Sequence, residues 1–267
     1  MDPSSHQESS DGSILSTELD IEDISVPSGP SWYDGRLLGF DLETTSLDTR
    51  EALPVQCAFV LKRSGTPLHY DSKSAIVNPG VEIPDTAAAI HHIDTARARA
   101  EGIPLEQAAQ RTVQRILWAS EQHIPLVGYN LAYDLTIVDR MARQLLGSGL
   151  VDRGWCGPVI DVYVLDKQLD MYRSGSRKLV DVAQHYNVGF DGAHDAHADV
   201  VGTLNVLLAM VEQYDLLQSP LDEWWQCQIE WRKEQCASYS EYRVGRGQPP
   251  VPAHEYHWPM YDFGTSE

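Results

Sequence analysis

The sequence lacks several features that would each indicate a particular class of protein. Its four cysteines are far apart and form no Cys-x-x-Cys pair, so we expect neither a zinc knuckle nor a dense disulfide framework. This cysteine usage fits a reduced, cytoplasmic setting. No basic segment followed by an apolar one opens the chain, which argues against a signal peptide. No apolar run approaches a membrane span, and we expect no membrane partner.

Basic residues are also scarce. The 267-residue chain has 20 Lys and Arg against 39 Asp and Glu, a formal net charge of −19. Such a balance argues against a protein that grips long nucleic acid through a broad basic surface. It does not exclude an enzyme that holds a few nucleotides through metal ions.

The chain divides into three parts by composition. Residues 1–33 contain no Lys or Arg and are rich in Ser, Asp and Pro, so we expect a disordered acidic tail. Residues 34–215 carry the regular apolar patterns of one folded domain. Residues 216–267 predict a C-terminal helix and an irregular tail that packs on or extends this domain.

The patterning predicts an α/β fold with a mixed five-stranded sheet and helices on its faces. The expected strands are residues 36–41, 55–62, 68–77, 124–129 and 159–162. The expected helices are residues 86–91, 104–120, 131–146, 163–170, 179–186, 195–214 and 222–242. The first three strands have only turn signals between them, which predicts an antiparallel meander.

Two carboxylates, Asp41 and Glu43, follow the first apolar run one residue apart. Strand alternation sends both side chains to the same face, where two unpaired carboxylates repel each other and raise a pKa. A hard divalent cation such as Mg²⁺ or Mn²⁺ would relieve this repulsion. The plain alternative is a strand end with two solvated acids.

Two further motifs lie at the starts of predicted helices. Asn130 and Asp134 are four residues apart and share one helical face, with Asn130 as an expected N-cap. In the third motif, His194 and Asp199 would differ by roughly 140° on one regular helix. They meet at one site only if His194 precedes the helix, with Asp195 as its N-cap. His197 lies on nearly the opposite side of this helix from Asp199, and we expect little catalytic role for it.

In this order, the three motifs resemble those of the DEDDh branch of DnaQ-like 3′–5′ exonucleases, a group that includes the proofreading epsilon subunit of bacterial DNA polymerase III. The resemblance extends over about residues 36–213 and includes Val77-Asn78-Pro79 and the segment 88–94. It implies a ribonuclease H-like exonuclease fold. One departure is His92, where the family usually has glycine after the histidine that corresponds to His91.

The resemblance implies a site for two divalent metal ions, with Mg²⁺ as the expected cofactor and Mn²⁺ as a substitute. Asp41 would bridge both ions, Glu43 and Asp199 would complete one site, and Asp134 would hold the second ion. His194 would be the general base that takes a proton from the attacking water. The expected substrate-binding residues are Thr44, Thr45, His91, Asn130, Arg177 and Lys178. A plain loop histidine and a solvated helix end remain alternatives for His91 and for the Arg177–Lys178 pair.

The expected function is a metal-dependent 3′–5′ exonuclease that releases nucleoside 5′-monophosphates from single-stranded or frayed DNA ends, in proofreading or repair. An exoribonuclease is the first alternative, since the motifs do not distinguish DNA from RNA. A non-catalytic module that binds nucleic acid or a polymerase is the second. Free-standing activity is the default over a polymerase or repair partner. Trp224, Trp225 and Trp231 predict either core packing or a partner surface.

Overall fold

The computed structural model describes residues 31–65, 68–189 and 195–263. Residues 1–30 of the expected acidic tail lie outside this range, and so does His194. Within the described segments, no helix is both long and apolar enough to cross a membrane.

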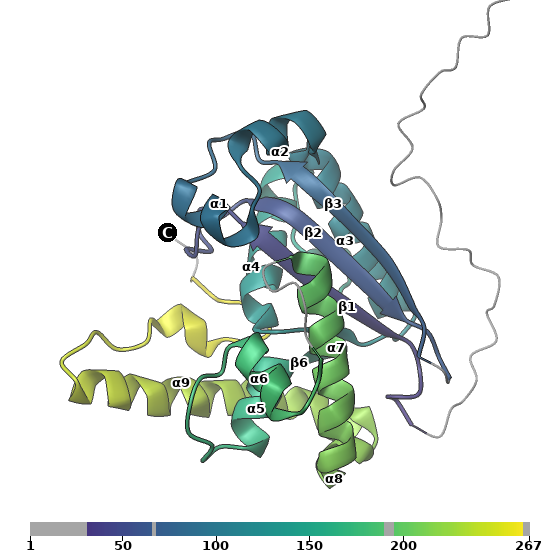
Figure 1. The fold of residues 1–267 in the computed structure, drawn as a ribbon, viewed down its shortest axis with the longest axis vertical. Helices are drawn as coiled ribbons and strands as arrows, with labels where there is room; N and C mark the ends of the chain where they lie inside the picture. Colours follow the sequence, from purple (N-terminus) through teal and green to yellow (C-terminus); the bar gives the residue numbers. More distant parts are fainter. Residues whose placement is uncertain (1–30, 66–67, 190–194, 264–267) are drawn as a thin grey trace, which may run out of the picture.

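The core is a six-stranded mixed sheet in the order β4-β3-β2-β1-β5-β6 (Figure 1). Its strands are β1 Leu37–Thr44, β2 Pro54–Lys62, β3 Tyr70–Asn78, β4 Ile103–Pro104, β5 Leu126–Gly128 and β6 Val159–Asp161. The expected meander is present, because β2 pairs antiparallel with both β1 and β3. The prediction of five strands is wrong by one, since two-residue β4 is too short to give a periodic signal.

Nine α-helices lie within the described residues. They are α1 Asp85–His91, α2 Thr95–Glu101, α3 Leu105–Glu121, α4 Leu131–Leu146, α5 Val162–Leu169, α6 Leu179–His185, α7 Ala196–Gln213, α8 Asp215–Gln218 and α9 Gln228–Gly245. Helix α7 covers one face of the sheet, and α3 and α4 cover the other (Figure 1).

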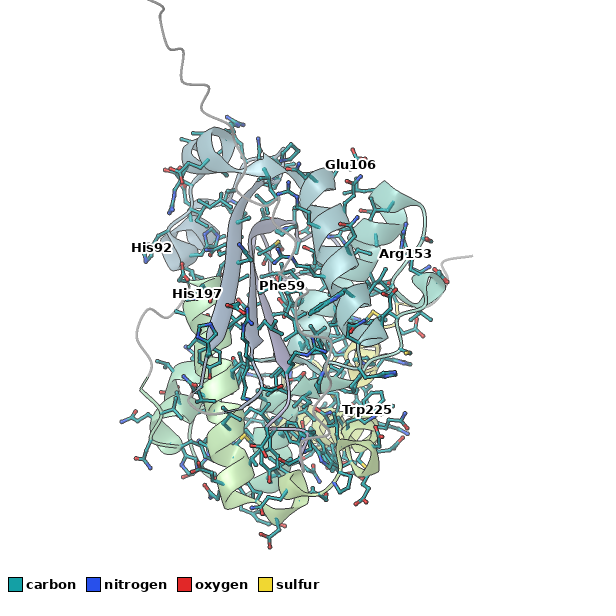
Figure 2. All side chains as sticks on the ribbon, turned by 90° about the vertical axis from the view of Figure 1, so that its right-hand side faces the viewer. Phe59, His92, Glu106, Arg153, His197 and Trp225 are labelled. Carbon is teal, nitrogen blue, oxygen red and sulfur yellow. The ribbon has the colours of Figure 1, made fainter. Side chains whose placement is uncertain are left out.

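Alternation along β1 builds both layers of the core. Leu38, Phe40 and Leu42 belong to the cluster that packs under α3 and α4. Phe40 stacks on Phe59 of β2 with 4.6 Å between ring centroids, and Figure 2 shows Phe59 in the middle of the sheet. Gly39 faces α7, so the residues two and four positions later point to the α7 side as well.

The C-terminal helix begins six residues later than expected. Trp224 has an extended φ of −135° and separates two 3₁₀ turns, so α9 starts only at Gln228. The spacing of Trp224 and Trp231 therefore does not describe one helix face. Trp224 is buried and packs edge-on against Trp32 at 5.4 Å, and the Trp32 indole donates to the Leu217 carbonyl. Trp32, assigned above to the tail, is thus part of the core.

The segment after residue 215 is bonded to the edge of the sheet. The Gln228 amide accepts from the Asp161 N–H at 2.8 Å and donates to the Val159 carbonyl at 2.9 Å. Further along, the Trp258 indole donates to the Asp161 carboxylate, and the Tyr261 N–H donates to Thr136 Oγ1. This region packs directly on β6 and α4.

Gly39→Ala should destabilise the protein by about 1–3 kcal/mol, because the added methyl group overpacks the contact between β1 and α7. A Cβ at Gly39 would clash with Val200 and lie 3.1 Å from Leu204 Cδ1. Urea denaturation measures the effect. Gly245→Ala is the matched control, since a Cβ there meets no atom within 4 Å. An equal, near-zero change in both variants would contradict this packing argument.

Candidate active site

Three acidic side chains from two elements converge on the α7 side of the sheet. Asp41 and Glu43 point there because they alternate with the buried Phe40 and Leu42 on β1. Asp199 lies in the first turn of α7. Ligand atoms of Asp41, Glu43 and Asp199 all lie within 4.8 Å of one another. Strand β1 continues to Thr44, so the two acids of the first motif lie within the strand rather than beyond its end.

The pKa values of the β1 carboxyls are raised. Burial raises the pKa of Asp41 well above its ordinary value, and the negative charges of Asp134, Asp199 and Glu43 raise it further. Burial, then Asp199 and Asp195, raise the pKa of Glu43 to about 8. Each group is thus harder to ionise because its neighbours are acids, and a cation among them would reverse this effect.

Asp134 lies beside these acids but is held separately. Its carboxylate accepts the Leu42 N–H at 3.1 Å and is almost fully buried. Burial raises its pKa well above the ordinary value, while the Leu42 hydrogen bond opposes that rise. Asp134 is outside the group of three close carboxylates, so the structure brings together three of the four expected ligands directly.

Asn130 occupies the N-cap position of α4 but does not cap the helix with its side chain. Its backbone is left-handed, with φ of 58°, and its side chain makes no capping hydrogen bond. The Asn130 N–H instead donates to the buried Asp161 carboxylate at 2.9 Å. The expected capping role is therefore wrong, and the half-buried amide stays available for another contact.

The two threonines after Glu43 hold the turn that closes the site. Thr44 Oγ1 lies 2.5 Å from the Tyr133 hydroxyl, and Tyr133 also donates to the Ser46 carbonyl. Thr45 Oγ1 accepts the Leu53 N–H at 3.1 Å. Both side chains thus have partners in the protein, and the Thr45 N–H is paired as well, with the Leu53 carbonyl at 2.9 Å.

His91 presents a buried donor. The Ile93 N–H donates to its Nδ1 at 3.2 Å, so the proton of the neutral ring is on Nε2. Nε2 makes no hydrogen bond of good geometry among the described residues, although the Thr44 backbone lies near enough to raise the pKa of the ring. Burial lowers the pKa of His91, which favours this neutral form. The following His92 has φ of 59°, a conformation that glycine adopts without strain.

Arg177 is held by the protein rather than free to contact a phosphate. Its guanidinium pairs with the fully buried Asp166 at 2.7 Å, and Arg173 pairs with the same carboxylate. Arg177 also donates to the Asp170 and Asp166 carbonyls. The structure therefore does not support the expected phosphate contact of Arg177. Lys178 is exposed at the start of α6.

The third motif is described from Asp195 onward. Asp195 caps α7 by accepting the His197 and Ala198 N–H groups, as the spacing predicts. His197, labelled in Figure 2, lies with Nε2 2.8 Å from Ser72 Oγ on β3, so its ring faces the sheet edge.

Sequence reasoning missed two side chains that position the site. Tyr133 ties α4 to the turn after β1, and its place between Asn130 and Asp134 in the second motif is the signal that could have shown it. The Gln56 amide accepts the Ala196 N–H at 3.3 Å and donates to Asp195 at 3.4 Å. Gln56 thereby joins β2 to the start of α7, and no local pattern in the sequence indicates this contact.

Comparison with protein families decides the assignment of this domain. A family model described as Exonuclease (RNase_T) matches residues 38–207, well over half of the chain. The chain belongs to this exonuclease family. The predicted resemblance to DEDDh-type exonucleases is thus confirmed at the level of the family, whereas a specific similarity to the epsilon subunit stays a prediction. No curated protein sequence matches the chain.

Solved structures of exonuclease I share the fold of this exonuclease domain. The Escherichia coli enzyme in complex with a dT13 oligonucleotide is 19% identical, with a TM-score of 0.57 over 67% of this chain and 41% of its own. Exonuclease I from Methylocaldum szegediense is 21% identical, with a TM-score of 0.57 over 68% of this chain and 42% of its own. A zinc-bound E. coli complex with single-stranded DNA is 16% identical, with a TM-score of 0.59 over 79% of this chain and 45% of its own.

These likenesses establish the α/β fold of the exonuclease domain, with its mixed sheet between helices. The alignments span less than half of each solved exonuclease I chain. The family and the carboxylate group together indicate a dependence on divalent metal.

The metal-free protein should lose stability as pH rises from about 5 to about 8. The pKa of Glu43 is raised in the folded state from 4.5 to about 8, so between these values the folded protein binds more protons than the unfolded chain, and stability falls as pH rises. Thermal unfolding in chelator across this range measures the slope. Glu43→Gln should flatten it, and a slope identical in both proteins would contradict the assigned pKa.

Proposed function

We propose that the protein is a metal-dependent 3′–5′ exonuclease that removes nucleoside 5′-monophosphates from single-stranded DNA. The observation that carries this proposal is the group of three carboxylates within 4.8 Å, two of which, Asp41 and Glu43, have raised pKa values, in a domain of the exonuclease family. The solved E. coli exonuclease I structures with dT13 and dA16 support the choice of single-stranded DNA.

The side chains of this group fit hard divalent cations. All three are carboxylates, which suit Mg²⁺ or Mn²⁺ better than a metal that prefers nitrogen or sulfur ligands. We infer two ions, held by Asp41, Glu43 and Asp199, with Asp134 as the fourth ligand. When bound, such ions would neutralise the charge that develops on the scissile phosphate and lower the pKa of water.

Other residues of the chain would bind the substrate or accept the proton of the attacking water. His194 directly precedes the N-cap of α7 in the sequence and is our candidate for the base that takes the proton of the attacking water. His91 has a buried Nε2–H that would donate to the terminal nucleotide. The turn fixed by Thr44 and Tyr133 offers backbone groups for the terminal sugar. A polymerase or repair partner stays a prediction.

Asp199→Asn should abolish cleavage and leave the fold intact, because it removes a ligand and also removes charge crowding near Asp41. The assay uses matched 5′-labelled DNA and RNA strands, with Mg²⁺ or with chelator, and matched 3′-blocked strands. Glu212→Gln is the control, since Glu212 is an exposed acid at the far end of the same helix.

For the wild type and Glu212→Gln, we expect Mg²⁺-dependent shortening of DNA from a free 3′ end. Wild-type rates in Asp199→Asn would refute the ligand assignment. Faster cleavage of the RNA strand would instead favour the exoribonuclease, and internal cuts in 3′-blocked strands would contradict an exonuclease.

A further inference from the structure

Two tyrosines near the end of α9 present their rings to solvent. The rings of Tyr239 and Tyr242 stack with 6.1 Å between centroids and 17° between planes. Their side chains are 49% and 53% exposed. Large aromatic side chains in this exposed, ordered arrangement form a surface on which another flat ring can stack.

Cationic groups lie over both rings. The Arg243 guanidinium is 5.8 Å from the Tyr239 ring, and that of Arg246 is 4.6 Å from the Tyr242 ring. Lys167 reaches Tyr239 from a different helix, α5, at 5.9 Å. Within the described parts of the chain, none of these three cations forms an ion pair with an acid.

These cations gather in a chain whose net charge is −19. From Tyr239 to Arg246 the chain carries two arginines and one acid, Glu241. Intrahelical contacts explain why each arginine lies over the tyrosine four residues before it. They do not explain Lys167, which joins the same group from α5. The cluster therefore combines aromatic rings with positive charges, and such a combination can bind an anion that also carries flat rings.

The cluster connects to the active site through aromatic contacts. Lys167 also lies 5.1 Å from the Tyr163 ring, and Tyr163 meets Tyr129 edge-on at 5.7 Å. Tyr129 immediately precedes Asn130 of the second motif. Helix α9 packs against α5 and extends outward from it (Figure 1).

We propose that Lys167, Tyr239, Tyr242, Arg243 and Arg246 form a binding track for single-stranded nucleic acid. Bases pack on the exposed surface of the two tyrosines and of the guanidinium groups that lie over them, and the cations contact the phosphates. The track binds the part of the strand that lies on the 5′ side of the nucleotide in the active site. This strand direction rests on the proposed function. It lies outside residues 38–207, which match the family, except for Lys167.

The test compares wild-type protein with the double variant Tyr242→Ala/Arg246→Gln, both exposed positions. Fluorescence anisotropy with labelled dT16 in chelator measures binding without cleavage. We expect Kd to rise about tenfold, from one lost stacking contact and one lost cation, with a shallower dependence on salt. Lys233→Gln is the control, since Lys233 is an exposed cation of α9 that pairs with Glu230. Circular dichroism and thermal unfolding verify that each variant folds.

A second readout separates this inference from the proposed function. With Mg²⁺, wild-type protein should cleave dT16 with a higher kcat/KM than dT4, and the double variant should lose this preference. Absence of cleavage in the wild type would refute the proposed function, while the dT16 affinities would still test the track. Equal dT16 affinity in wild type and double variant would overturn the track, as would an equal loss in Lys233→Gln.

Discussion

Mutual repulsion among carboxylates is the constraint on which the site depends. Asp41 and Glu43 on β1 face Asp199 on α7, and burial together with the charge of Asp199 makes both β1 carboxyls harder to ionise. Apolar packing must therefore hold the two elements together against this repulsion. Gly39 allows it, since the missing side chain lets Val200 and Leu204 approach the strand backbone. The fold thus holds the carboxyl groups close together at an electrostatic cost, and a bound cation would offset this cost.

The C-terminal extension and the site share one buried group. Asp161 accepts the Asn130 N–H from the second motif, and its other oxygen accepts from the Trp258 indole. Gln228, at the start of α9, bonds the Asp161 backbone. The start of α9 and the backbone of the second motif are thus both bonded to Asp161.

Apolar patterns in the sequence predicted the structural features that depend on the spacing of nearby residues. Helix α4 has the expected bounds, Leu131–Leu146, because its apolar stripe lies within it and Gly147 directly follows as its C-cap. The shared face of Asp41 and Glu43 follows from strand alternation. Pairing between different elements was not predictable, since no spacing in the sequence shows that the Arg177 guanidinium forms an ion pair with Asp166. The prediction that Trp224 belongs to the C-terminal helix was wrong for the same reason, because its partner, Trp32, is almost two hundred residues away in the sequence.

Anomalous diffraction from crystals soaked in Mn²⁺ tests the central claim most directly, because it locates the cation itself. The account predicts a strong peak within about 2.0–2.5 Å of carboxylate oxygens of Asp41, Glu43 and Asp199. Crystals of Asp199→Asn should show a weaker peak or none. Mn²⁺ bound elsewhere on the protein, with no peak among these three carboxylates, would contradict it.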